Sequence, residues 1–337
     1  MLYPARSILA IDTSPFGQSL AMLPAIRALR ASYPMTLVAA AAASGTCGLL
    51  TAAGLADETI SLGVVKPSDH ARSGAFKRLL GLAKVARRLN FEVVLDFSPS
   101  VETLVVSRLA MRGRVFTPSR LPRVISVLLD FGVSSRAGLT AQSDYANVLR
   151  QLGVEMNDVQ LAITPSVEED ALFEDRLSSS GSRGGELIVL LYASNPLSRR
   201  SWPVDAFGEI GTRLANNFNA RIVAADEPSD DTFTGAVGRL LPPGAIRLAQ
   251  PRALELIAGI ARASLVITDD PGIAQIASEL STPVIEIADA NSSTAESSTA
   301  HRIAHASSRS RVSPEGVYEI AGELIQENRS RSLFRRP

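Results

Sequence analysis

Short apolar runs of strand length alternate with longer amphipathic segments along most of this chain. In the first half, apolar runs at 7–12, 35–41 and 91–97 predict strands. We also expect a short strand at 123–129 and helices at 19–32, 77–90, 101–112 and 145–152, the last closed by Gly153. Strands that alternate with helices are typical of parallel sheets covered on both faces.

The second half repeats the alternation. Strands are expected at 187–192, 221–225, 265–268 and 283–287, and helices at 204–216, 253–263, 272–279 and 313–326. The Ser/Thr/Ala-rich stretch 289–312 is expected to be a loop. The whole pattern predicts an α/β protein with two Rossmann-like, doubly wound domains that face each other across a cleft.

A run of serines and glycines at 178–185 indicates a flexible connection between the two halves. We therefore expect an N-terminal domain at 1–170, a linker at 171–185 and a second domain at 186–312, followed by a C-terminal helix and tail at 313–337. The length of 337 residues suits two domains of about 150 residues each.

The net charge of zero conceals a difference between the halves. Residues 1–165 contain 17 basic and 11 acidic side chains, and residues 166–337 contain 17 basic and 23 acidic ones. The basic half suits an anionic partner such as a phosphorylated acceptor or a membrane surface, although ordinary drift gives the same count. A neutral chain is not typical of nucleic-acid binders, so no nucleic-acid partner is expected.

One cysteine (Cys47) and three histidines exclude a disulfide framework and argue against a metal centre, so no metal is expected. The uncharged stretch 31–56 approaches the length of a membrane span, but its small, weakly hydrophobic residues favour a strand, a loop at 44–46 and a short helix. The N-terminus lacks the pattern of a secretory signal. A cytoplasmic protein is therefore expected.

Ligands of parallel α/β sheets bind beyond the carboxyl ends of the strands, so residues in these positions are the candidates for chemistry. After the first strand, Asp12 to Gln18 include Gly17, which allows close approach to a helix N-terminus. This segment is equally an ordinary strand-to-helix turn.

After the strand at 187–192, the segment 193–203 combines Ser194 and Asn195 with Arg199 and Arg200. These residues either bind a diphosphate or include two arginines that are simply solvated.

Two acidic segments follow other strands. Asp269 and Asp270 precede Gly272 at the start of a helix, where they either cap the helix or form a loop whose amides hold phosphate. The segment 226–231 offers Glu227 and Asp230 to a ribose hydroxyl, or is a solvated acidic turn. The chain has no G-x-x-x-x-G-K-[ST] phosphate loop and no G-x-S-x-G nucleophile elbow.

The order of these segments resembles glycosyltransferase family 9, which comprises the heptosyltransferases of lipopolysaccharide core assembly and their relatives. The opening Ile8-Leu9-Ala10-Ile11-Asp12 with Phe16-Gly17-Gln18 and the strand 91–96 are similar to the family's first and middle strands. The segment 199–207 resembles its basic Trp-Pro motif, and 265–272 with Thr282-Pro283-Val284 resembles its donor-binding motif. The likeness covers most of the chain.

The resemblance implies a GT-B fold, an acceptor-side first domain, a nucleotide-sugar-binding second domain and a last helix that packs back on the first domain. Relatives transfer a sugar with inversion and without a metal. This chain departs from the family at the reacting centre, where Gln18 stands in place of the proposed base, an Asp. Arg199 or Arg200 replaces a lysine, Pro271 a hydroxyl residue and Gln275 a histidine.

These observations predict transfer of a heptose-like sugar from a nucleotide-diphosphate donor to an anionic cell-envelope glycolipid or glycan. The protein would need no cofactor and would contact the inner face of the cytoplasmic membrane through its basic half. Asp12 is the hypothesised substitute base. The alternative is a degenerate relative that binds a nucleotide sugar or acts as a scaffold. The expected site comprises Asp12 and Gln18 for catalysis, and Gly17, Ser194, Asn195, Arg199, Arg200, Glu227, Asp230, Asp269, Asp270, Gly272 and Gln275 for the donor.

Overall fold

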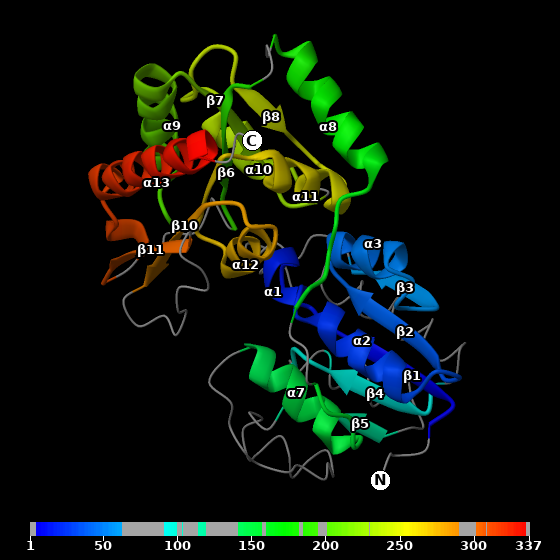
Figure 1. Cartoon of the computed structure of the whole chain (residues 1–337). Coiled ribbons are helices and arrows are strands. Elements are labelled where there is room, and N and C mark those ends of the chain that lie inside the picture. Colours follow the sequence, from blue (N-terminus) through cyan, green and yellow to red (C-terminus); the bar gives the residue numbers. More distant parts are fainter. Residues whose placement is uncertain are drawn as a thin grey trace. The chain divides into compact units, whose positions relative to one another are not determined.

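The computed structural model of the chain describes residues 5–62, 91–99, 103, 114–118, 141–156, 160–181, 185–194, 201–228, 230–289, 301–307 and 309–334. The chain divides into two compact units, Met1–Leu161 and Ala162–Pro337. Each unit is built on one parallel sheet with helices around it (Figure 1). The predicted α/β class with two doubly wound units is therefore confirmed.

The sheet of unit 1 has the strand order β3-β2-β1-β4-β5. Its strands are β1 (Ser7–Ile11), β2 (Leu37–Ala42), β3 (Glu58–Ser61), β4 (Val93–Asp96) and β5 (Arg114–Phe116), and its described helices are α1 (Phe16–Ser19), α2 (Met22–Ser32), α3 (Ser44–Ala52) and α7 (Ala141–Gln151). The neighbouring strands β1 and β4 are almost wholly buried and, apart from Ser7 and Asp96, apolar, as is typical of a sheet covered on both faces.

The sheet of unit 2 has the order β11-β10-β9-β6-β7-β8. Its strands are β6 (Leu187–Tyr192), β7 (Ala220–Ala225), β8 (Ile246–Leu248), β9 (Leu265–Thr268), β10 (Val284–Asp289) and β11 (His301–Ala306). Its helices are α8 (Val167–Ser179), α9 (Val204–Phe218), α10 (Thr232–Val237), α11 (Ala253–Arg262), α12 (Pro271–Glu279), the 3-10 helix η1 (Arg309–Arg311) and α13 (Pro314–Phe334).

Two helical layers cover the sheet of unit 2 (Figure 1). On one face, Trp202, Phe207 and Phe233 form an aromatic chain of edge contacts, with ring centroids 4.7 and 5.0 Å apart. Side chains of α9, α10 and α13 complete this buried cluster. On the other face, α8 and α11 approach closely enough that a Cβ on Gly259 would lie 3.0 Å from the Phe173 ring.

The expected linker at 171–185 is wrong over most of its length, because α8 occupies residues up to Ser179. Ser166 caps this helix by accepting the Glu169 amide, and three acidic residues in its first turn favour the helix dipole. Arg262 and Asp170, 2.7 Å apart, join α11 to α8. The first unit accordingly ends at Leu161 rather than at residue 170.

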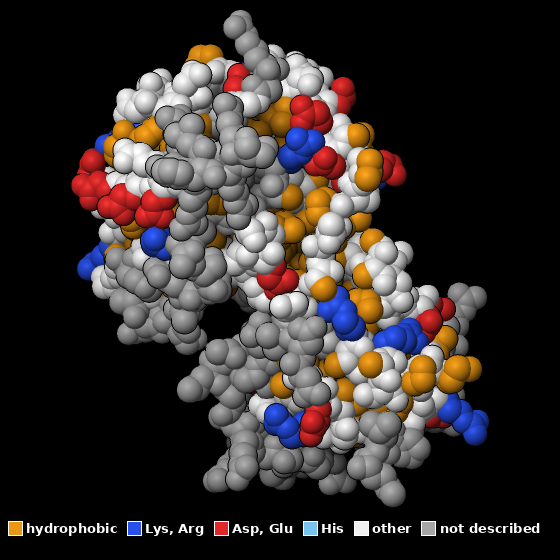
Figure 2. Space-filling model, viewed as in Figure 1, with side chains coloured by type: hydrophobic (Ala, Val, Ile, Leu, Met, Phe, Trp, Pro, Cys, Tyr) orange, Lys and Arg blue, Asp and Glu red, His pale blue; other side chains and the backbone are white. Residues whose placement is uncertain are grey.

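The C-terminal region also differs from expectation. Residues 289–312 contain a strand, β11, which pairs in parallel with β10, where a loop was predicted. The polar composition of this stretch does not predict a strand, and the strand is formed by its hydrogen bonds to β10. Helix α13 packs within unit 2: Arg213 of α9 forms a bidentate ion pair with Glu315, whereas the expectation placed this helix on the first domain. Acidic side chains gather over α13 in Figure 2.

The stretch 31–56 contains the buried strand β2 and the helix α3, so the membrane-span alternative is wrong. The helix begins at Ser44, where a loop was expected. Among the residues that the structure describes, no helix has the length and apolar character needed to cross a bilayer. The predicted helix 77–90, the helix 101–112 apart from Thr103, and the strand 123–129 lie outside the described residues.

Candidate functional site

The chain order of each sheet reverses beside its first strand. In unit 1 the chain runs from β1 outward to β3 and returns to β4 on the other side of β1. In unit 2 it runs from β6 outward to β8 and returns to β9 beside β6. Ligands of doubly wound sheets bind beyond the carboxyl ends of the two strands that flank such a reversal. The residues after β1, β4, β6 and β9 are therefore the candidates.

Asp12 directly follows β1 and is fully buried. Its carboxylate accepts a hydrogen bond from the Ser14 amide at 2.8 Å on one oxygen and from the Tyr145 hydroxyl on the other. Tyr145 comes from α7, and its ring stacks on Phe97 with centroids 4.4 Å apart. The hypothesised base is thus held on both oxygens.

Asp96, the last residue of β4, is a second buried carboxyl group in the same place, because it is the register partner of Ile11. The Ser98 amide donates to its Oδ1 at 3.2 Å, and within the described part of the chain its Oδ2 has no hydrogen-bond partner. Burial raises the pKa of Asp96 to about 7, and the charge of Asp12 adds to the rise. Asp96 belongs to the segment that resembles the family's middle strand, but no role was expected for it.

The two strand ends of unit 1 are tied together by hydroxyl groups. The Thr13 amide donates to Ser98 Oγ at 2.6 Å, and the two side-chain oxygens are 2.9 Å apart. Gly17 is buried in α1, whereas Gln18 is exposed on that helix. The structure thus places Asp12 in the buried cluster and Gln18 on the surface.

Asp269 joins the corresponding strand ends of unit 2. It is fully buried, and it accepts the amide of Ser194 at 2.8 Å and the amide of Trp202 at 3.3 Å. The indole of Trp202 donates in turn to the Val312 carbonyl at 2.9 Å. Burial raises the pKa of Asp269. Asp269 therefore fixes both ends of the segment that contains the predicted basic motif.

Asp270 caps α12 in the way that one of the two alternatives predicted. Its Oδ1 accepts the amides of Gly272 at 2.8 Å and Ile273 at 3.1 Å, and Pro271 occupies the first helical position. Burial raises the pKa of Asp270 to about 6, and the neighbouring charge of Asp269 raises it as well. Gln275 lies farther along α12, where its amide donates to Glu279 at 3.2 Å.

The acidic segment after β7 is a buried cap rather than only a solvated turn. Asp226 accepts the amides of Phe233 at 2.7 Å and Thr234 at 3.2 Å, and also the Thr234 hydroxyl. Burial raises the pKa of Asp226 to about 6. Glu227 is buried beside it, and Asp230 accepts the Thr232 hydroxyl at 2.7 Å. Asp226 belongs to the predicted segment 226–231, but only Glu227 and Asp230 were expected to have a role.

Tyr192 ends β6 in the middle of these carboxylates. Burial raises its pKa well above the usual range, and the charges of Asp270, Glu227, Asp269 and Asp226 act in the same direction. Four acidic groups therefore surround one buried phenol at the carboxyl end of the sheet. An anionic ligand at this edge needs a cation to offset them.

Arg309 of η1 is such a cation, although it was not among the residues expected in the site. Its charge lowers the pKa values of Asp269 and Asp270 against the effect of burial. Its Nε is buried and has no hydrogen-bond partner in the described ranges. Its amide donates to Asp289, the end of β10, at 2.7 Å. No motif marks Arg309, because the polar stretch around it was expected to be a loop.

The structure brings Ser194, Asp269, Asp270 and Gly272 to the ends of β6 and β9, and Glu227 and Asp230 to the end of β7. Asn195, Arg199 and Arg200 lie outside the described residues. Within the described ranges, no group of three or more Cys, His, Asp and Glu side chains is arranged to hold a metal ion.

No protein-family model matches the sequence, and the search of curated proteins gives no match. Solved structures do match. A family 9 glycosyltransferase of Veillonella parvula has a TM-score of 0.70 at 16% identity over 96% of this chain and 97% of its own. E. coli heptosyltransferase WaaC with ADP-2-deoxy-2-fluoro heptose has a TM-score of 0.64 at 16% identity, with 94% and 99% covered.

A third likeness is to UDP-GlcNAc 2-epimerase from Neisseria meningitidis bound to UDP-GlcNAc, with a TM-score of 0.55 at 15% identity and coverages of 95% and 91%. At these identities the comparisons show the fold. The resemblance to glycosyltransferase family 9 is therefore confirmed at the level of the fold, which is the two-unit GT-B fold over nearly the whole chain.

Proposed function

We propose that this protein is a glycosyltransferase that moves a sugar from a nucleoside-diphosphate donor to an acceptor hydroxyl group. The observation that carries the proposal is the joining of Ser194 to Asp269 at the ends of β6 and β9. This hydrogen bond lies at the carboxyl ends of the strands, beside the start of α12, and doubly wound sheets bind nucleotides in such positions, which supports the proposal. The fold shared with the heptosyltransferases supports the same assignment.

Unit 2 is the donor-binding unit in this proposal. Asn195 and one of Arg199 and Arg200 would hold the diphosphate, with the N-terminal end of the α12 dipole beside them. Glu227 or Asp230 would hold the ribose hydroxyls. Asp269 and Asp270 would act by keeping the two loops in place, because both already accept backbone amides.

Unit 1 would take the acceptor and remove its proton. The acceptor hydroxyl oxygen attacks the anomeric carbon, the bond from this carbon to the diphosphate oxygen breaks, and the diphosphate leaves with the electron pair. The product has the inverted configuration. This step needs a carboxylate for the proton and a cation for the leaving group, and no metal.

We extend the proposal to a heptose-like sugar and to an anionic glycolipid or glycan of the cell envelope as acceptor.

A second candidate is a relative that binds the nucleotide sugar without transferring it. Gln18, Pro271 and Gln275 favour it, because they stand where the resemblance expects an acid, a hydroxyl residue and a histidine. In this case the carboxylates of unit 1 would have only a structural role.

Calorimetric titration with ADP-, GDP- and UDP-sugars, followed by product analysis, separates the candidates. Binding with release of the nucleoside diphosphate supports the transferase. Binding without turnover supports the sugar-nucleotide-binding protein. The absence of binding to all three classes contradicts both candidates and indicates an interaction protein.

A further inference from the structure

Two fully buried carboxyl groups share the reversal point of unit 1. Asp96 of β4 is the register partner of Ile11, the last residue of β1, and Asp12 directly follows Ile11. The charge of Asp12 contributes to the raised pKa of Asp96. Two carboxyl groups that are close together and buried do not both ionise readily. The hydrogen bonds around each group then decide which one ionises first and which one keeps its proton to higher pH.

Asp12 has a donor on each oxygen, namely the Ser14 amide and the Tyr145 hydroxyl. Tyr145 is itself fixed by stacking on Phe97, and Asp144 lies next to it on α7. A carboxylate that is engaged on both sides is well placed to orient its neighbours. It is poorly placed to receive a further proton from a substrate.

Asp96 is engaged on one side only. Ser98 donates to Oδ1, and the Thr103 hydroxyl donates to the carboxyl group, while Oδ2 is buried and has no hydrogen-bond partner among the residues that the structure describes. Buried polar atoms without a partner are rare in folded proteins and call for an explanation. An acceptor hydroxyl group that donates to Oδ2 would supply the missing partner.

We infer that Asp96, rather than Asp12, is the carboxylate that takes the proton from the acceptor hydroxyl. This inference rests on the proposed function. In the step described above, the proton moves from the hydroxyl oxygen to Oδ2 of Asp96 as that oxygen bonds to the anomeric carbon. A base with a pKa of about 7 is efficient near neutral pH, because about half of it is ionised there and the carboxylate is still strongly basic.

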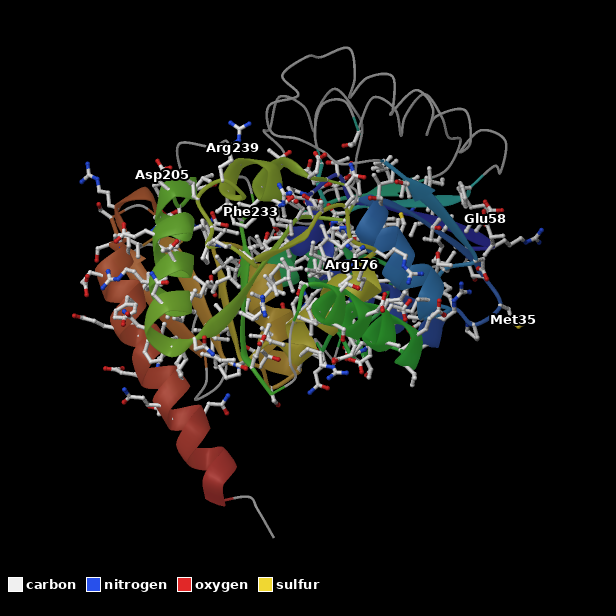
Figure 3. The ribbon with its side chains drawn as sticks, turned by 90° about the horizontal axis from the view of Figure 1, so that it is seen from above. Met35, Glu58, Arg176, Asp205, Phe233 and Arg239 are labelled. Atoms are coloured by element: carbon white, nitrogen blue, oxygen red, sulfur yellow. The ribbon has the colours of Figure 1, made fainter. Side chains whose placement is uncertain are left out.

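The test uses the full chain with the ADP-, GDP- or UDP-sugar that the wild type turns over, and with water as the acceptor. Asp96→Asn should lower kcat by about 100-fold or more. The dissociation constant for ADP, which unit 2 would bind, should stay within about twofold. Glu58→Gln is the matched control: it removes an exposed carboxylate of the same unit (Figure 3) and should leave both quantities unchanged.

An active wild type whose Asp96→Asn variant keeps more than about a tenth of kcat overturns the assignment. A wild type that turns over none of the donors overturns the proposed function and the assignment with it. The pH profile of the wild type is an independent measurement that needs no variant. kcat/KM should fall as the pH drops below about 7, and a fall only near pH 4 would contradict a role for Asp96.

Discussion

The amide of Ser194 donates to Oδ1 of Asp269 at 2.8 Å, across the two strands between which the second sheet reverses its order. Asp269 also accepts the amide of Trp202, so one buried carboxylate holds both ends of the β6–α9 connection. This arrangement makes the shape of the candidate donor site depend on a residue that need not touch the donor.

Replacing Asp269 by Asn should therefore loosen this connection. An amide side chain accepts through one oxygen only and turns N–H groups toward the second backbone amide. The free energy of unfolding of unit 2 should fall by about 1.5–3 kcal/mol, measured in urea by the fluorescence of Trp202, the sole tryptophan. Affinity for ADP should fall as well. The exposed Asp205→Asn change on α9 (Figure 3) is the control, and an equal effect of both variants would contradict the role.

Replacing Arg309 by Gln should weaken the binding of a diphosphate. The change removes a cation next to Asp269 and Asp270 and leaves their charges less offset. We expect the dissociation constant for ADP to rise by about tenfold, as calorimetry would measure, which corresponds to about 1.4 kcal/mol. Arg311→Gln is the matched control, because Arg311 is an exposed arginine of the same short helix. Equal dissociation constants of the two variants for ADP would contradict a role of Arg309 in binding the diphosphate.

The stability of unit 1 should fall as the pH rises toward 7. The pKa of Asp96 is raised to about 7 in the folded chain, against about 3.9 when unfolded, so the folded state binds more protons between these values. Asp96→Asn should flatten this dependence and increase stability at about pH 8. Urea unfolding followed by circular dichroism checks this, with Trp202 fluorescence as the reference for unit 2. An unchanged slope would show that Asp96 does not titrate in this range.

Two helical glycines should respond in opposite ways to alanine. A Cβ on Gly208 of α9 would lie 2.5 Å from the Cβ of Leu240, so Gly208→Ala should destabilise unit 2 by about 1–3 kcal/mol. A Cβ on Gly322 of α13 would meet Phe218 at 3.6 Å, an ordinary contact. Gly322→Ala should therefore stabilise the unit by about 0.5–1 kcal/mol through helix propensity. Urea midpoints read by Trp202 fluorescence compare the two, and a stabilised Gly208→Ala variant would contradict the close approach.

The strands and helices with strong periodicity were predictable from the sequence. Strand β6 and helices α9 and α11 lie within two residues of their expected bounds, because their apolar runs are long and bounded by polar residues. Helix α8 was not predicted, since the serines after it indicated a linker and its capping residue Ser166 was not recognised. Strand β11 was not predicted either, because only pairing with β10 makes its polar sequence a strand.

The candidate site was predictable in position but only partly in its members. The rule that ligands bind at strand ends led to Asp12, Ser194, Asp269 and Asp270. The rule does not say which carboxylates are satisfied by backbone amides, and that property separates Asp12 from Asp96. Arg309 comes to the site from a distant segment, and such a contact depends on the folded chain rather than on local spacing.

Among the described strands, both sheets follow one winding: β3-β2-β1-β4-β5 in unit 1, and β8-β7-β6-β9-β10-β11 in unit 2. The two halves are thus topological copies, and their residues can be matched by register. Asp96 pairs with the last residue of β1, and Thr268 pairs with Tyr192, the last residue of β6. The carboxyl group that we propose as the proton acceptor in unit 1 is therefore matched in unit 2 by a hydroxyl group, which is not a base at neutral pH.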